Sequence, residues 1–329
     1  MREFIKKVPI PTAGVALGLA ALGNLLQPYT EIAHVACGAL ATVLVALLIA
    51  KIALFPAMIR DDLRNSILAS VSATLFMALM QLSTYLAPLA FIPAFVLWGA
   101  AVAAHLALMV GFSARFIARF KLHEVFPTYF ICYVGIIVAS ATSPVFGMEA
   151  LGHVLFWVGF IFYLALLVLV TYRYAKHEVP EPARPLFCIY TAPMSLSIVG
   201  YLATAPSPNP VFVGIMLVLA QALFLIVLAR LPKLLRLKFY PSYAAMTFPF
   251  VITATAFGQA VAFLNAAGAG LPGALDILFA AETAIAAVMV AYVFGHYVRF
   301  FVRRIELPQS EPVVRENKMT AHFAEHFEN

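Results

Sequence analysis

Charged residues are scarce in this chain of 329 residues: Asp, Glu, Lys and Arg make up 11% of it, whereas hydrophobic residues make up 64%. Soluble globular proteins carry about 25% charged residues, so the composition excludes an ordinary soluble domain. Apolar runs of roughly 20 residues, the length of a transmembrane helix, recur along almost the whole chain. The sequence therefore predicts an all-α integral membrane protein with the lipid bilayer as its surroundings.

Signatures of catalysis and of cofactor binding are also lacking. No phosphate-binding glycine loop, nucleophile elbow or pair of catalytic carboxylates is recognisable. The three cysteines, Cys37, Cys132 and Cys188, lie in apolar runs without metal-ligand spacing. We therefore expect no enzyme activity, no cofactor and no metal. The first apolar run continues into a second, so we expect it to be a retained helix rather than a cleaved signal peptide.

Basic residues are absent from one whole set of predicted loops. All 21 Lys and Arg residues lie near the N-terminus, at or after the end of an even-numbered apolar segment, or in the C-terminal tail. Such an excess marks the cytoplasmic side, so we expect a multi-pass protein of the cell membrane with both termini cytoplasmic. This topology explains the net charge of +6 without a nucleic-acid partner. The ten predicted spans are 9–27, 31–53, 66–86, 90–113, 126–146, 150–172, 184–204, 210–231, 240–264 and 274–300.

The predicted spans divide the chain into three parts. Residues 1–8 form a short cytoplasmic N-terminus, and residues 9–304 form one ten-helix domain. Residues 305–329 are polar and mixed in charge, which is typical of a solvated cytoplasmic tail.

Proline spacing reveals an internal repeat. Pro11, Pro127, Pro185 and Pro241 lead the first, fifth, seventh and ninth spans in steps of 116, 58 and 56 residues, and the first step is twice the repeat. The third span begins near the position of the missing member but has no proline. Proline suits the first turn of a helix, where its missing N–H would have no partner. Five repeats of two helices each point the same way through the membrane, so the sequence predicts five parallel helical hairpins around a central pore.

Hydroxyl and small residues are concentrated in the odd-numbered spans. The even-numbered spans are richer in unbroken Leu, Val, Ala and Phe, which suits contact with lipid. We therefore expect the odd-numbered spans to form an inner ring along the pore. The candidate pore-lining residues are Thr12, Gly14, Gly18, Ser70, Thr74, Thr128, Thr191, Ser195 and Thr247.

Helix-breaking residues recur at one depth in three repeats. Pro193 and Pro249 each follow their leading proline by eight residues, and Gly135 stands at the same offset in its own span. This offset corresponds to about 12 Å along a helix. Proline and glycine are in general more frequent in transmembrane helices than in soluble ones. Their coincidence at one offset nevertheless favours helix kinks at the pore.

The sequences "PIPTAGVALGLAALGN" in the first span and "YAAMTFPF" in the ninth resemble the tellurite-resistance/dicarboxylate transporter family. That family includes bacterial tellurite-resistance proteins, fungal malate and sulfite transporters and the plant guard-cell slow anion channel. The resemblance implies a homotrimer with one pore per protomer for small anions, either inorganic anions such as sulfite or C4-dicarboxylates such as malate. It also implies that Phe248 plugs the pore. Phe250, two residues further along the helix, is expected to face away.

Two transport mechanisms remain open at this point. A gated channel needs only the pore, the gate and weak anion binding. A proton-coupled carrier of dicarboxylate or sulfite needs a titratable group, and Glu282 in the tenth span is the candidate, because intramembrane carboxylates are commonly functional. Glu282 could instead make a structural hydrogen bond or a subunit contact. The sequence does not identify the transported anion.

Overall fold

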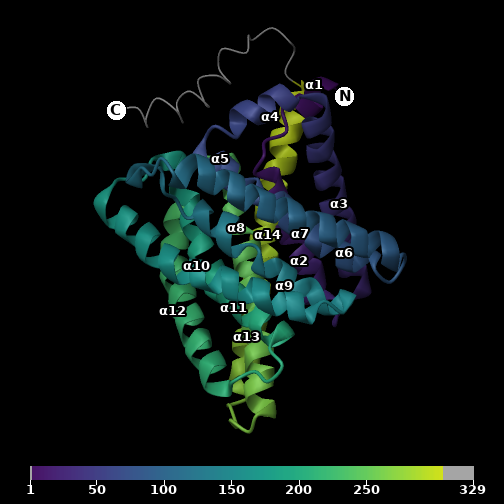
Figure 1. The fold of residues 1–329 in the computed structure, drawn as a ribbon, viewed down its shortest axis with the longest axis vertical. Helices are drawn as coiled ribbons and strands as arrows, with labels where there is room; N and C mark the ends of the chain where they lie inside the picture. Colours follow the sequence, from purple (N-terminus) through teal and green to yellow (C-terminus); the bar gives the residue numbers. More distant parts are fainter. Residues whose placement is uncertain (1, 307–329) are drawn as a thin grey trace.

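The inner helices of the molecule come from the odd-numbered predicted spans. A computed structural model describes residues 2–306, in which all regular secondary structure is helical (Figure 1). The predicted tail 305–329 lies almost wholly outside the described residues. The inner segments are α2 (Thr12–Leu26), α5 (Ser66–Val71) with α6 (Ala73–Leu86), α8 (Thr128–Val134) with α9 (Ile137–Thr142) and η3 (Ser143–Phe146), η4 (Glu181–Thr191) with α11 (Ala192–Thr204), and η5 (Pro241–Met246) with α13 (Phe248–Ala266).

The even-numbered spans form the outer helices, which are longer and less interrupted. Short helices precede the first inner segment or lie between an outer helix and the next inner segment. The outer helices are α3 (Glu31–Leu54), α7 (Phe91–Phe112), α10 (Glu149–Lys176), α12 (Pro210–Leu234) and α14 (Ala274–Glu306), and the short ones are α1 (Arg2–Lys6), α4 (Pro56–Asp62), η1 (Ser113–Ile117) and η2 (Leu122–Glu124).

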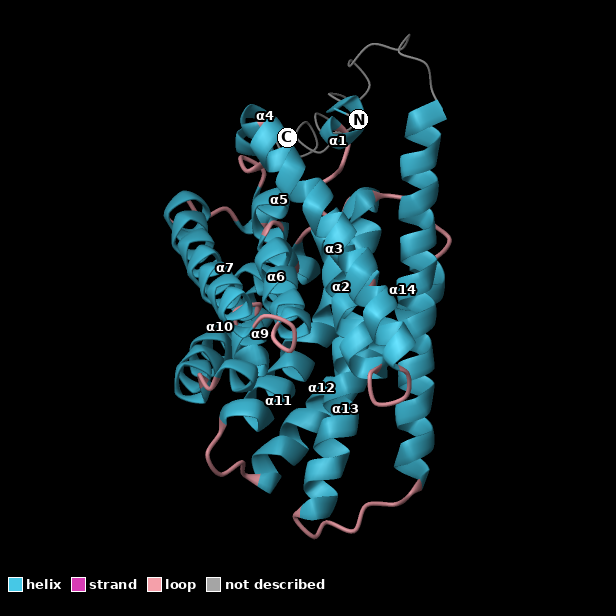
Figure 2. Ribbon diagram, turned by 90° about the vertical axis from the view of Figure 1, so that its right-hand side faces the viewer, coloured by secondary structure: helices cyan, strands magenta, loops and turns pink. Residues whose placement is uncertain are grey.

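The inner segments close into a ring. In order around it, α2 packs against α6, α6 against α8 and α9, α9 against α11, α11 against α13, and α13 against α2 again. Each outer helix packs on its own inner partner and on the next inner segment, so α14 packs on both α13 and α2. Figure 2 shows α7 and α14 on opposite flanks of the bundle. This arrangement is the five-hairpin ring that the repeat predicts.

Burial separates the two rings. In three of the inner segments, those that begin at Ser66, Glu181 and Pro241, 72–83% of the most apolar window is buried. In the five outer helices the corresponding share is 28–39%. The exposed surface of the outer helices is apolar, with Val168 and Val218 among the most exposed side chains. That surface suits contact with lipid.

The number of membrane spans is not confirmed as ten. Within the described residues, eight helices are long and apolar enough to cross a membrane, and a ninth span results if α8 and the α9–η3 segment, bent by 50° between them, count as one. The first predicted span contains the shorter α2, of 15 residues. Pro9 and Pro11 precede it and lack an N–H, and residues 9–14 form turns with hydrogen bonds three residues apart.

Buried donors on three outer helices hold the leading turns of their own inner partners. Lys51 Nζ on α3 donates to the carbonyl oxygen of Val8 at 2.7 Å, and Tyr297 Oη on α14 donates to that of Pro241 at 2.6 Å. Arg173 Nη2 on α10 donates to the carbonyl oxygen of His123 at 3.3 Å. The first, third and fifth hairpins thus use the same device, which fixes where each inner segment starts.

The α2–α13 contact that closes the ring depends on a glycine. A Cβ atom at Gly18 would lie 2.5 Å from Cβ of Thr247 and 3.0 Å from the backbone nitrogen of Phe248. Close approach of two backbones at small residues is a common device in membrane helix packing. Thr247 Oγ1 also donates to the carbonyl oxygen of Gly14 at 2.9 Å across the same contact.

We expect Gly18→Ala to destabilise the protein by about 1–3 kcal/mol, the usual cost of forcing extra volume into a well-packed site. Thermal unfolding of the purified protein in detergent measures this change. The matched control is Gly99→Ala on α7, where an added Cβ meets no atom within 4 Å. Equal unfolding temperatures for the two variants would contradict the role of Gly18 in ring closure.

Candidate functional site

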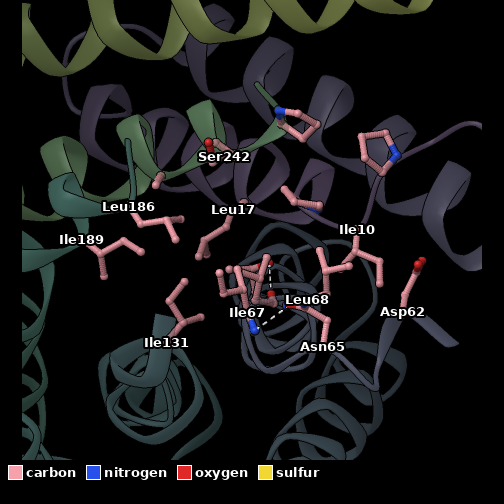
Figure 3. A pocket seen from close by; sticks show the side chains of 18 of the residues that line it. Ile10, Leu17, Asp62, Asn65, Ile67, Leu68, Ile131, Leu186, Ile189 and Ser242 are labelled. Carbon is pink, nitrogen blue, oxygen red and sulfur yellow. Dashed lines mark hydrogen bonds between the residues drawn. The ribbon is translucent and has the colours of Figure 1, made fainter. Parts of the chain in front are cut away.

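A cavity of about 640 Å³ lies inside the ring, and all five inner segments contribute to its wall (Figure 3). Depth is counted here from the start of each inner segment towards its end. The lining reaches only into the first part of each inner segment, and no residue from the second half of α2, α6, α11 or α13 lines the cavity. The cavity therefore ends partway along the bundle. The deepest lining residues are Gly14, Leu17, Thr74, Met77, Val134, Gly135, Pro193, Leu196, Phe248 and Pro249.

The wall of the cavity is mainly apolar. Figure 3 shows the side chains of Leu17, Ile131, Leu186 and Ile189 around the space, and the last two come from η4. A wall of this kind offers an ion few strong partners. The sequence analysis named none of these apolar residues. The signal that could have found some of them is helical spacing, because Leu17, Met77 and Leu196 each follow a lining residue by three positions.

Two of the nine residues expected to line a pore, Gly14 and Thr74, line the cavity. The other seven are buried within the bundle but lie outside this lining: Thr12, Gly18, Ser70, Thr128, Thr191, Ser195 and Thr247.

Most of these hydroxyls satisfy backbone carbonyl groups instead. Ser70 donates to Ser66, Ser195 to Thr191 and Thr191 to Cys188, three or four residues back along the chain. Thr74 donates to Val71 in the same way although it lines the cavity. Such bonds are the common alternative for Ser and Thr in helices. The hydroxyls of Thr12 and Thr128 are buried without a hydrogen-bond partner.

The three helix-breaking residues all line the cavity, and each stands where an inner segment is interrupted. Gly135 separates α8 from α9, and its N–H reaches back five residues to the carbonyl oxygen of Phe130. Pro193 and Pro249 lie in the first turns of α11 and α13, directly after the 3₁₀ segments η4 and η5. The ninth span is thus broken at Thr247, with φ −107° and ψ −88°, and Pro249 begins the new helix.

Phe248 and Phe250 point in different directions. Phe248 lines the deep part of the cavity and is 5% exposed. Phe250 lies outside the lining and packs edge-on against Phe224 of the outer helix α12, with ring centroids 6.1 Å apart. The break at Thr247 therefore places the first of the two rings at the cavity and the second in the packing between the rings of helices.

The open end of the cavity carries charges of both signs. Figure 2 shows α1 and α4 together at this end of the bundle, and the α13–α14 loop at the opposite end. The buried Lys51 also lies 3.9 Å from the Asp62 carboxylate. The charges are nearly balanced, with four cationic and three acidic residues: Lys6, Lys7, Lys51 and Arg64 against Glu3, Asp61 and Asp62.

Asp62 has an unusual environment for a carboxylate at the membrane surface. Burial raises its pKa above the ordinary value, and the nearby Asp61 adds to this effect. The positive charge of Lys51 opposes the shift without cancelling it. The side chain is 22% exposed, so protons from the solution reach it.

Glu282 lies away from the cavity. It is 2% exposed on the outer helix α14, and the side chain of Gln221 on α12 is its hydrogen-bonding neighbour. Within residues 2–306, no group of three or more His, Cys, Asp or Glu side chains lies close enough to hold a metal ion.

Comparison with known proteins gives one assignment, and it agrees with this architecture. The model of the family described as voltage-dependent anion channel matches residues 7–298. No curated protein matches the chain. The match covers all the inner segments and all the outer helices except the last residues of α14, and it confirms the family that the sequence resembles. A closed ring of helical hairpins around a cavity is therefore the framework of a membrane transport protein, and the chain belongs to the voltage-dependent anion channel family, which transports anions across the membrane.

Proposed function

We propose that this protein conducts small anions along the axis of its ring, through one pore per protomer, and that Phe248 closes the pore. The observation that carries the proposal is the cavity itself. It opens among charged residues, all five inner segments wall it, and Phe248 and Pro249 belong to its deepest lining. An aromatic ring at an apolar constriction excludes water and ions, which is a recognised way to gate a channel.

Two features favour anions over cations in this path. The α-helices α11 and α13 begin at the cavity wall, and the N-terminal end of a helix carries a partial positive charge. In addition, no Lys or Arg lines the deep part of the cavity. Weak attraction without a fixed counter-charge lets an anion enter and also leave, as conduction requires.

For the transported anion we propose a class rather than a single compound. The cavity volume of about 640 Å³ is in the range of sites for small organic molecules, so both inorganic anions such as sulfite and C4-dicarboxylates such as malate fit. We propose that the charged end faces the cytoplasm, because Lys and Arg gather there. The protein acts as a homotrimer in this proposal, in keeping with the family that it resembles.

Phe248→Ala is expected to raise anion flux by at least about tenfold, the change that follows when a barrier falls by ~1.4 kcal/mol. Flux into liposomes is measured with chloride, nitrate, sulfite and malate in turn, which also identifies the preferred anion. Phe250→Ala is the control, because it removes the same side chain from a position that faces α12. If the two variants conduct alike for every anion, Phe248 is not the gate.

Acidification at the charged end is expected to raise anion flux. Because burial raises the pKa of Asp62, this group takes up its proton at a higher pH than an ordinary aspartate. Below that pKa the mouth holds four cations and two anionic groups, so anions enter more readily. We expect a roughly twofold to fivefold increase, since one charge near a surface contributes ~0.5–1 kcal/mol.

Asp62→Asn is expected to show the higher flux already at neutral pH and to lose the acid-dependent step. Asp61→Asn serves as its control, since Asp61 is an exposed neighbour that also lines the mouth. The control changes the same charge and is expected to retain the step. An acid-dependent step of unchanged size in Asp62→Asn would assign the titration to another group.

Proton-coupled transport of a dicarboxylate or sulfite is the second candidate function. The buried carboxyl of Glu282 favours it, although Glu282 has Gln221 as a hydrogen-bonding neighbour and lies outside the cavity lining. In this case Glu282→Gln abolishes uptake driven by a pH gradient, whereas Asp276→Asn at the exposed start of α14 leaves it intact. If flux through both Glu282→Gln and Asp276→Asn does not depend on the pH gradient, the protein is a channel.

A further inference from the structure

A second cavity, of about 500 Å³, lies at the surface of the charged end. It is bounded by the C-terminal end of α10, the following loop with η4, and the C-terminal end of α12. It shares no lining residue with the central cavity, although η4 contributes to both. Its lining residues are Tyr174, His177, Glu178, Val179, Arg184, Phe187, Arg230, Lys233, Leu234 and Leu237.

Three of its cations, Arg184, Arg230 and Lys233, are exposed and have no carboxylate within salt-bridge distance among the residues that the structure describes. Elsewhere at this end, Lys51, Arg64 and Lys121 each lie within 4 Å of an acidic group. Glu178 is the one acidic residue in the second lining. The second cavity is therefore a site of uncompensated positive charge.

A buried hydroxyl adds a second, separate indication. Tyr174 lines the cavity, and its hydroxyl is buried with no hydrogen-bond partner in the part of the chain that the structure describes. Buried polar atoms are nearly always hydrogen-bonded. A ligand oxygen in the cavity would accept a hydrogen bond from this hydroxyl, and the three cations would neutralise the charge of the ligand.

The apolar part of the lining suits a ligand that also contacts lipid. Val179, Phe187, Leu234 and Leu237 form this part, and α10 and α12 are outer helices with exposed apolar side chains. Basic pockets between membrane helices on the cytoplasmic side are suited to anionic lipid headgroups. The position of the cavity therefore allows a headgroup to enter from the bilayer.

The 3₁₀ geometry of η4 explains why one segment serves both cavities. Residues three apart in a 3₁₀ helix stand on the same face. Leu186 and Ile189 face the central cavity, whereas Arg184 and Phe187 face the surface cavity.

We propose that this surface cavity binds a phosphate group, with Arg184, Arg230 and Lys233 around its oxygens and the Tyr174 hydroxyl as a further donor. A phospholipid headgroup and a soluble phosphate ester carry the same group. The apolar lining residues favour the lipid as its source.

The test measures binding of two probes to the purified full-length protein in detergent: dioctanoyl phosphatidylglycerol and glycerol 3-phosphate. Arg230→Gln/Lys233→Gln is expected to weaken binding of the lipid by at least about tenfold, because each cation near a membrane surface contributes to attraction. Tyr174→Phe removes one hydrogen bond and is expected to weaken it about threefold. The matched control is Arg119→Gln/Arg236→Gln, which removes two exposed cations outside both cavities.

Saturable binding that the cavity variants lose and the control keeps supports the site. Binding of the lipid alone identifies a headgroup with its chains, and equal binding of both probes identifies the phosphate as sufficient. Absence of saturable binding to the wild-type protein overturns the proposal, as does an equal loss in the control. If Arg230→Gln/Lys233→Gln unfolds at a lower temperature than the wild type, the same binding measurement is made with Arg184→Gln, which lies on η4.

Discussion

Interrupted backbone is the feature on which the rest of this structure depends. In lipid, every backbone N–H and C=O needs a partner within the protein or in a water-filled cavity. The inner segments depart from regular α-helix at Gly135, along η4 and at Thr247, where the backbone uses other hydrogen bonds. Five outer helices separate these breaks from lipid, and they are themselves long and mostly regular. The division into an inner and an outer ring follows from this difference.

Closure of the ring determines how the polar side chains are used. Thr247 bonds across the α2–α13 contact to Gly14, and Ser195 bonds to Thr253 between α11 and α13 at 3.2 Å. Asn24 and Gln81 join α2 to α6 in the same way, at 2.7 Å. These groups stabilise the ring itself, so the cavity is left with a mainly apolar wall. An apolar wall suits a path that ions cross without strong binding.

The two cavities at the charged end of the molecule differ in how far their positive charges are neutralised. At the mouth of the central cavity, Lys51 and Arg64 lie next to Asp62 and Asp61, so the local field is weak. Around the surface cavity, Arg230 and Lys233 have no such partners within residues 2–306. The mouth of the central cavity therefore carries little of the chain's net positive charge. More of the net positive charge lies in the other loops at this end and on the surface between α10 and α12.

The sequence by itself determined the membrane class and the paired helices, because hydrophobic length and the 58-residue proline period report directly on what lipid and symmetry require. The family came from the resemblance of the stretches that begin the first and ninth spans. The sequence also predicted that Gly135, Pro193 and Pro249 stand at one depth. Only the tertiary structure decided which side chains line the cavity. A serine or threonine hydroxyl can bond to its own helix or face a cavity, and spacing does not distinguish the two. The packing of α2 against α13 and the turn of η4 make that choice, since they determine which face of each segment looks inward.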